Sequence, residues 1–86
     1  MNYFVYILIS SNKGKYTTYV GYTSNLSKRI KLHNNSKGAK FTRGRKWKLI
    51  FKEKYKNKSL AMKAEFKLKK NNKIRNFIKE SYIQNQ

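Results

Sequence analysis

Residues 18–33, TYVGYTSNLSKRIKLH, change from the pattern of a strand to that of a helix within a few positions. The first part, 19–23, is rich in β-branched and aromatic residues, which suit a pleated strand. Ser24 and Asn25 follow, and their side-chain oxygens can cap the first turn of a helix. The next apolar or weakly polar positions recur at helical spacing, at Leu26, Ile30 and His33. The stretch therefore predicts a strand that leads directly into a helix over about 24–34.

The same helix gathers polar groups that can act on one ligand. Arg29 and His33 are four residues apart, which places them one turn apart on one side of the helix. A phenol, Tyr19, precedes them on the strand. A guanidinium, an imidazole and a phenol that converge on one point suit phosphate chemistry. We therefore expect a candidate site here.

The length and composition bound the class of protein. A chain of 86 residues has room for one core, so we expect a single domain over 1–86. The absence of cysteine excludes disulfides and thiolate metal sites. The sequence shows neither the pattern of a signal peptide nor an apolar run near the roughly 20 residues of a membrane span. We expect a cytoplasmic, soluble protein.

The charge balance indicates a polyanionic partner. Lysine and arginine number 22 against three acidic residues, for a formal net charge of +19. Nucleic acid, bound largely through its phosphates, is the simplest partner for this charge. An anionic membrane surface is one alternative, but no stretch has the wide apolar face of a surface-lying basic helix. A drift toward lysine is another, and it does not by itself explain the scarcity of acids.

The remaining elements predict an α+β fold. Residues 3–9 are all apolar or aromatic, as in a central strand buried on both faces. The turn-forming residues 10–15 join this strand to the next one in a hairpin. Residues 47–55 alternate in part and predict a third strand, with Trp47, Leu49, Phe51 and Tyr55 on one face.

Two helices are expected after the third strand. One covers about 60–70, capped by Asn57 or Ser59, and the other about 73–83. The order is β-β-α-β-α-α, with a small three-stranded antiparallel sheet flanked by helices. Between the first helix and the third strand, residues 35–46 read as a mobile basic loop or a solvated connector. Its cations and one from the first helix are candidate nucleic-acid contacts: Lys28, Lys40, Arg43, Arg45 and Lys46.

Three further side chains are candidates for chemistry. Glu65 falls on or beside the apolar stripe of the second helix, where an unpaired carboxylate is costly. It is either an ion-pair partner of a lysine or the single carboxylate ligand of a hard cation such as Mg²⁺. Tyr6 and Tyr19, on the two strands of the hairpin, are expected to face each other or nearly so. Phenols in strands usually pack, but two hydroxyls that project beside Arg29 would need hydrogen-bond partners, which makes these two candidates.

These residues together resemble the GIY-YIG nuclease superfamily, and its small single-domain bacterial members most of all. The resemblance rests on Val5-Tyr6-Ile7, Tyr19-Val20-Gly21, Arg29, His33 and Glu65, in this order. Phe4 stands where the first motif has glycine, and Val20 replaces an isoleucine. No second DNA-binding domain is attached, so the resemblance implies low sequence specificity or a protein partner that supplies it.

The resemblance implies metal-dependent cleavage of phosphodiester bonds, with Mg²⁺ or Mn²⁺ bound by Glu65. Tyr6 or Tyr19 would orient or activate water, Arg29 would stabilise the transition state, and His33 would transfer protons or bind phosphate. Gly21 would permit a close turn beneath the site. We expect an endonuclease that acts on DNA more than RNA, directed by structure or damage, as in DNA repair. A non-catalytic DNA- or RNA-binding module and a ribosome-associated basic protein are the alternatives.

Overall fold

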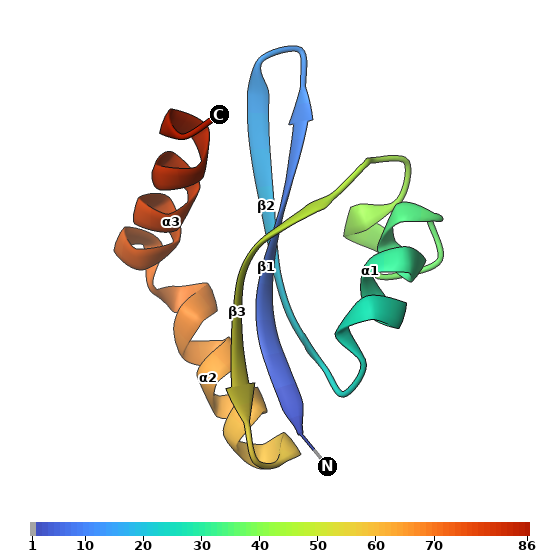
Figure 1. The fold of residues 1–86 in the computed structure, drawn as a ribbon, viewed down its shortest axis with the longest axis vertical. Helices are drawn as coiled ribbons and strands as arrows, with labels where there is room; N and C mark the ends of the chain where they lie inside the picture. Colours follow the sequence, from blue (N-terminus) through green and yellow to red (C-terminus); the bar gives the residue numbers. More distant parts are fainter. Residues whose placement is uncertain (1) are drawn as a thin grey trace.

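A three-stranded antiparallel sheet forms the centre of the structure, a computed structural model in which residues 2–86 are described (Figure 1). The strands are β1 (Tyr3–Asn12), β2 (Lys15–Thr23) and β3 (Lys48–Tyr55), in the order β2-β1-β3. The helices are α1 (Leu26–Asn34), the 3₁₀ helix η1 (Lys40–Thr42), α2 (Lys58–Lys70) and α3 (Asn72–Gln84). The predicted order and the antiparallel α+β architecture are confirmed.

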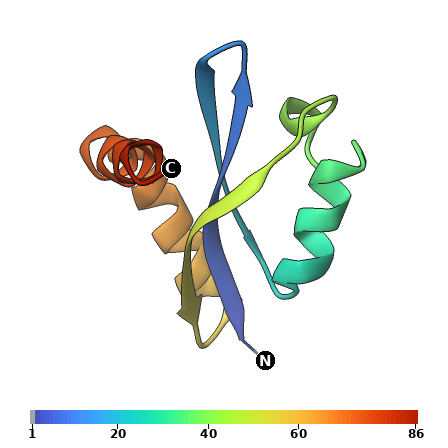
Figure 2. The ribbon, with the colours of Figure 1, turned by 45° about the horizontal axis from the view of Figure 1, so that its top comes forward.

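The two faces of the sheet carry separate apolar clusters. On one face Val5 and Ile7 of β1 pack with Val20 and with Ala61 of α2. On the other face the buried cluster consists of Tyr6, Leu8 and Trp47. Helix α1 packs on it through Leu26 and Ile30. Helix α1 thus lies on one side of the sheet, and α2 with α3 on the other (Figure 2). The expectation of a central first strand buried on both faces is confirmed.

Asparagine side chains begin all three α-helices. The side chain of Asn25 accepts a hydrogen bond from the Lys28 amide, and Asn57 and Asn71 do the same for the third residue after each. This side-chain oxygen satisfies one of the amide groups left unpaired at a helix start. Of the alternative caps, Asn25 and Asn57 are the ones used, so α1 begins at residue 26 rather than near 24.

The register of the hairpin differs from the prediction by two residues. Tyr6 lies opposite Gly21, and Tyr19 lies opposite Leu8. The reason is the turn, which consists only of Lys13 and Gly14, both with positive φ, rather than the whole of 10–15. Two-residue turns with positive φ match the twist of a hairpin. Because the shift is an even number of residues, both phenols still project from the same face.

The third strand changes face partway along its length, which the predicted alternation missed. The pairing of β1 with β3 slips between Ile7 and Leu8, so that Phe51 and Leu49 become their respective partners. An extra residue in one strand reverses the direction of the side chains that follow. Trp47 and Leu49 therefore pack on the α1 side, whereas Phe51 and Tyr55 pack on the α2 side. The prediction that all four share one face is wrong.

Within residues 2–86, none of the helices combines the length and the apolar character needed to cross a bilayer.

Candidate active site at the sheet edge

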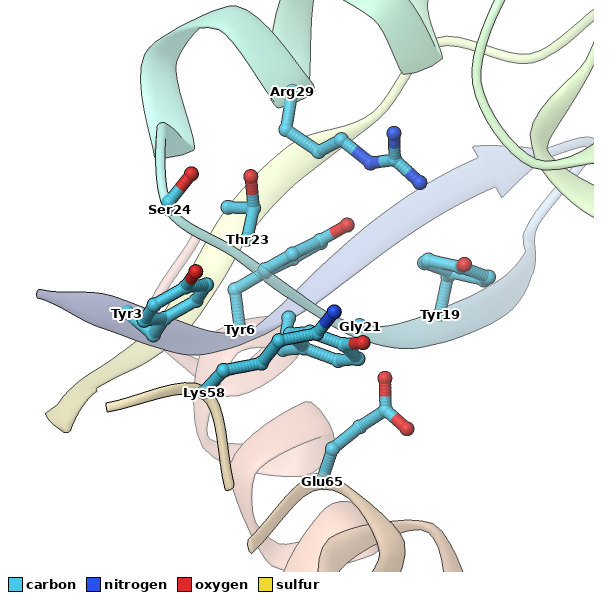
Figure 3. A pocket seen from close by; sticks show the side chains of 10 residues that line it. Tyr3, Tyr6, Tyr19, Gly21, Thr23, Ser24, Arg29, Lys58 and Glu65 are labelled. Carbon is cyan, nitrogen blue, oxygen red and sulfur yellow. The ribbon is translucent and has the colours of Figure 1, made fainter. Parts of the chain in front are cut away.

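A hollow of about 440 Å³ lies beside edge strand β2, where side chains from both faces of the sheet meet (Figure 3). Four of the five side chains predicted to act together line it: Tyr6, Tyr19, Arg29 and Glu65. In Figure 3 Arg29 descends from α1, Glu65 rises from α2, and the two phenols lie between them. The fifth, His33, is not part of the lining.

Glu65 reaches this hollow from the opposite face of the sheet. Its helix, α2, packs through fully buried Ala61 and half-buried Ala64, so the predicted stripe is present and Glu65 stands at its margin. The side chain is 17% exposed, and Oε1 lies 3.4 Å from Nζ of Lys69, one turn further along. The predicted ion pair with a lysine is therefore present. The carboxylate also lines the hollow, and its role as the ligand of a hard cation stays a prediction.

Gly21, on edge strand β2, leaves room for the tip of the Tyr6 ring. A Cβ atom at Gly21 would lie 2.5 Å from Oη of Tyr6 and 3.1 Å from Cε2 of Tyr19. The distance to Tyr6 is far shorter than van der Waals contact, so a side chain at this position would occupy the volume of that phenol, whereas the contact with Tyr19 would only be tight. Gly21 lies within β2 and not in a turn. The implied close turn is therefore wrong, and the glycine is needed for a close approach of side chains.

His33 lies behind Tyr6, with no exposed surface. Its Nε2 is 2.9 Å from Oη of Tyr6, and its Nδ1 is 2.8 Å from Oγ1 of Thr42. The Thr42 hydroxyl donates to the carbonyl of Ala39 at 2.7 Å, so its oxygen accepts from Nδ1–H of His33. Nε2 then carries the lone pair, and Tyr6 donates to it. His33 is thus placed to hold Tyr6, and its burial keeps it from direct contact with a phosphate.

Burial sets the protonation states of this pair. It raises the pKa of Tyr6 to about 12, although the nearby Arg29 guanidinium acts in the opposite direction. Burial also lowers the pKa of His33, and the positive charge of Arg29 adds to that effect. At neutral pH both side chains are therefore uncharged, which agrees with an O–H···N hydrogen bond between them.

Arg29 carries an unused hydrogen-bond donor. Its Nε is buried and has no hydrogen-bond partner in the part of the chain that the structure describes. A buried donor without an acceptor costs free energy, of the order of 1–3 kcal/mol. The guanidinium extends over the two phenols toward the hollow (Figure 3). Arg29 lines the hollow, and the fork of its guanidinium matches a phosphate bound there.

The predicted mobile loop contains the support for His33. Thr42, in η1, is fully buried, and its carbonyl accepts a hydrogen bond from Nε1 of Trp47 at 2.9 Å. Asn34 ties the same region together, because its side chain bonds both the amide and the carbonyl of Trp47. A Cβ atom at Gly38 would lie 2.5 Å from Nδ1 of His33. The expectation of a loop is wrong for Lys40–Thr42. Sequence reasoning missed Thr42 because it lies in a segment that is mostly cationic and glycine-containing.

The predicted nucleic-acid contacts fall into two groups. Lys28, Lys40, Arg43 and Lys46 are exposed, with Lys28 next to Arg29 on α1. Arg45 is half-buried, and its Nη1 donates to Oγ1 of Thr17 at 3.3 Å. Tyr3, Tyr22 and Lys58 also line the hollow, and no sequence pattern distinguished them from the other tyrosines and lysines.

The donor set fits a metal that needs few protein ligands. Among residues 2–86 there is no group of three or more His, Asp, Glu or Cys side chains that could enclose an ion. Glu65 is the carboxylate that lines the hollow. Mg²⁺ commonly takes one or two protein carboxylates and completes its octahedron with water and substrate phosphate. A single carboxylate in a hollow of this size fits such an ion.

Comparison with known proteins agrees with this geometry. A family model described as the GIY-YIG catalytic domain matches residues 2–77. The chain therefore belongs to the GIY-YIG family, which is part of a nuclease superfamily. Nucleases act on nucleic acids. Within that family its relatives are the small bacterial proteins named UPF0213.

Three of these relatives give the extent of the similarity. The chain is 51% identical over 71 residues to the UPF0213 protein CPE1444 of Clostridium perfringens, covering 81% of this chain and 72% of that protein. It is 40% identical over 84 residues to the UPF0213 protein YazA of Bacillus subtilis, covering 96% and 79%. A solution NMR structure of the UPF0213 protein BH0048 from Bacillus halodurans is 34% identical, with a TM-score of 0.47, covering 100% of this chain and 86% of that one.

Proposed function

We propose that this protein is an endonuclease that hydrolyses phosphodiester bonds in DNA with the help of Mg²⁺ or Mn²⁺. Its target would be defined by DNA structure or damage, with little sequence specificity. The observation that carries the proposal is the convergence of Tyr6, Tyr19, Arg29 and Glu65, from four separate elements and both faces of the sheet, on one hollow. Family membership and the net charge of +19 support a nucleic-acid substrate.

The side chains divide the work of hydrolysis. Arg29, which lines the hollow, would bind the scissile phosphate through the fork of its guanidinium and stabilise the charge that develops on it. Tyr6 would receive a proton from the attacking water while passing its own proton to Nε2 of His33, which already accepts it in a hydrogen bond. Glu65 would hold the metal, which when bound polarises the phosphate and eases departure of the leaving oxygen.

The direct test is cleavage of supercoiled and of branched DNA with Mg²⁺ or Mn²⁺. We expect nicking by the parent protein and a loss of roughly 100-fold or more in Arg29→Ala and Glu65→Gln, as is typical when a group that stabilises the transition state is removed. Glu80→Gln is the matched control, because Glu80 is an exposed carboxylate on α3 and does not line the hollow. Equal cutting by all four proteins would refute the assignment.

The alternative, a binding module without catalysis, predicts a different pattern. DNA affinity would fall steeply with salt, cleavage would be absent with either metal, and Glu65→Gln would bind no differently from Glu80→Gln. Binding curves at several salt concentrations, measured beside the nicking assay, separate the two functions.

A further inference from the structure

An exposed aromatic ring stands next to the candidate active site. Phe41, in η1, is 58% exposed. Its ring lies 6.2 Å from that of Tyr19 between centroids, with 22° between the ring planes, in a stacked arrangement. Tyr19 in turn lines the hollow. Phe41 is therefore one ring removed from the place where a phosphate would react, and much of its surface faces solvent.

The backbone that carries the Phe41 ring is held in place by its neighbour. The next residue, Thr42, is fully buried and is bonded to His33 and to Ala39, while Trp47 donates to its carbonyl. The Phe41 ring also lies 6.4 Å from the ring of Trp47. A ring held this way presents a flat apolar surface in a defined place, at little entropic cost on binding.

The surroundings of the ring are cationic. Lys40 precedes Phe41 and Arg43 follows it by two positions, and both side chains are exposed. An aromatic platform between cations matches a nucleotide, whose base stacks on the ring while its phosphates meet the charges. In a paired duplex the faces of the bases are already stacked on their neighbours. The ligand that fits is therefore a nucleotide with an unpaired base.

We propose that Phe41 stacks on an unpaired base adjacent to the phosphate in the hollow, and so directs the protein to single-stranded or locally unpaired DNA. The proposal deepens the proposed function by naming its substrate class, and it rests on that function only for cleavage. Stacking on Phe41 extends the pair that Phe41 already forms with Tyr19. The adjoining cations would guide the backbone toward Arg29.

Binding without cleavage tests this directly. Fluorescence anisotropy in EDTA would compare a labelled single-stranded oligonucleotide with a hairpin duplex of the same sequence. In Phe41→Ala and Phe41→Leu we expect affinity for the single strand to fall roughly 5- to 150-fold, the range for loss of one base–aromatic stack, and affinity for the duplex to change less than twofold. Phe41→Trp should restore the parent affinity, because it restores the flat ring.

Phe77→Ala is the matched control, since Phe77 is also an exposed phenylalanine, 73% exposed, on α3. It should bind both oligonucleotides like the parent. A fluorescent base analogue in the single strand should be quenched by the parent protein and by Phe41→Trp, and much less by Phe41→Ala. Far-ultraviolet circular dichroism of each variant would verify that the fold is retained.

The outcomes distinguish this proposal from the previous one. Single-strand affinity of Phe41→Ala within twofold of the parent, or an equal loss on duplex, would overturn the stacking role and leave an exposed ring that serves something else, such as a protein partner. Cleavage that depends on Arg29 and Glu65 but not on Phe41 would leave the nuclease assignment intact. Phe41-dependent binding by a protein that never cuts DNA would support the stacking role and refute the nuclease assignment.

Discussion

Replacing Gly21 by alanine would test how tightly the site is packed. The new Cβ would lie 2.5 Å from Oη and 2.7 Å from Cζ of Tyr6, whereas ordinary contact begins near 3.4 Å. The tip of the phenol must therefore retreat by about 1 Å, although Tyr6 is fully buried and bonded to His33 at 2.9 Å. Overpacking costs about 1–3 kcal/mol. A buried imidazole nitrogen that loses its donor adds about 1–3 kcal/mol.

The strand itself favours the opposite result. Alanine in a strand interior is normally more stable than glycine by about 0.5–1 kcal/mol. The net expectation for Gly21→Ala is a loss of about 1–5 kcal/mol of unfolding free energy, measured by urea denaturation. Cleavage should fall roughly 100-fold, because a displacement of 1 Å is enough to misplace a catalytic group. In the Tyr6→Phe background the substitution should cost less, since the atom nearest the new Cβ is gone. Gly21→Ala that is as stable as the parent would refute this reasoning.

Two further predictions concern the buried support of Tyr6. The pKa of His33 is lowered on folding, so the unfolded chain binds more protons below the ordinary value of 6.5 and stability falls as the pH drops from 7.5 toward 5.5. His33→Gln should lose this part of the pH dependence of the urea midpoint, and an unchanged slope would contradict the assignment. Trp47→Phe removes the donor to the Thr42 carbonyl and should cost about 1–3 kcal/mol by circular dichroism in urea, whereas parent-like stability would show that the carbonyl finds another partner.

The elements were predictable where one residue pattern dominates. The length and β-branching of the apolar run at 3–9 favour a buried strand, and asparagines at 25 and 57 offer oxygens where helices begin. The grouping of Tyr6, Tyr19 and Arg29 followed from their places on those elements, whereas Glu65 joined the group through the resemblance to the GIY-YIG nucleases.

Contacts that depend on details between elements were not predictable. The hairpin register depended on Lys13 and Gly14, which form a two-residue turn with positive φ. A run of several turn-forming residues does not indicate which two of them form the turn. The slip near Leu49 reversed one part of β3. Helical spacing put Arg29 and His33 on the same side, but their depths differ because η1 covers only the later turn, and η1 forms through Thr42. Nothing within 35–46 alone indicates that cover.

Glu65 approaches the hollow from the side of the sheet opposite to α1, and it comes late in the chain. A polypeptide whose synthesis has stopped before α2 already carries both phenols and Arg29, but it has no acid to complete the set. If the acid is required for cutting, unfinished copies on the ribosome can attract DNA without damaging it. The order of the elements would then act as a safeguard, because the capacity to cut arrives only once α2 has been made.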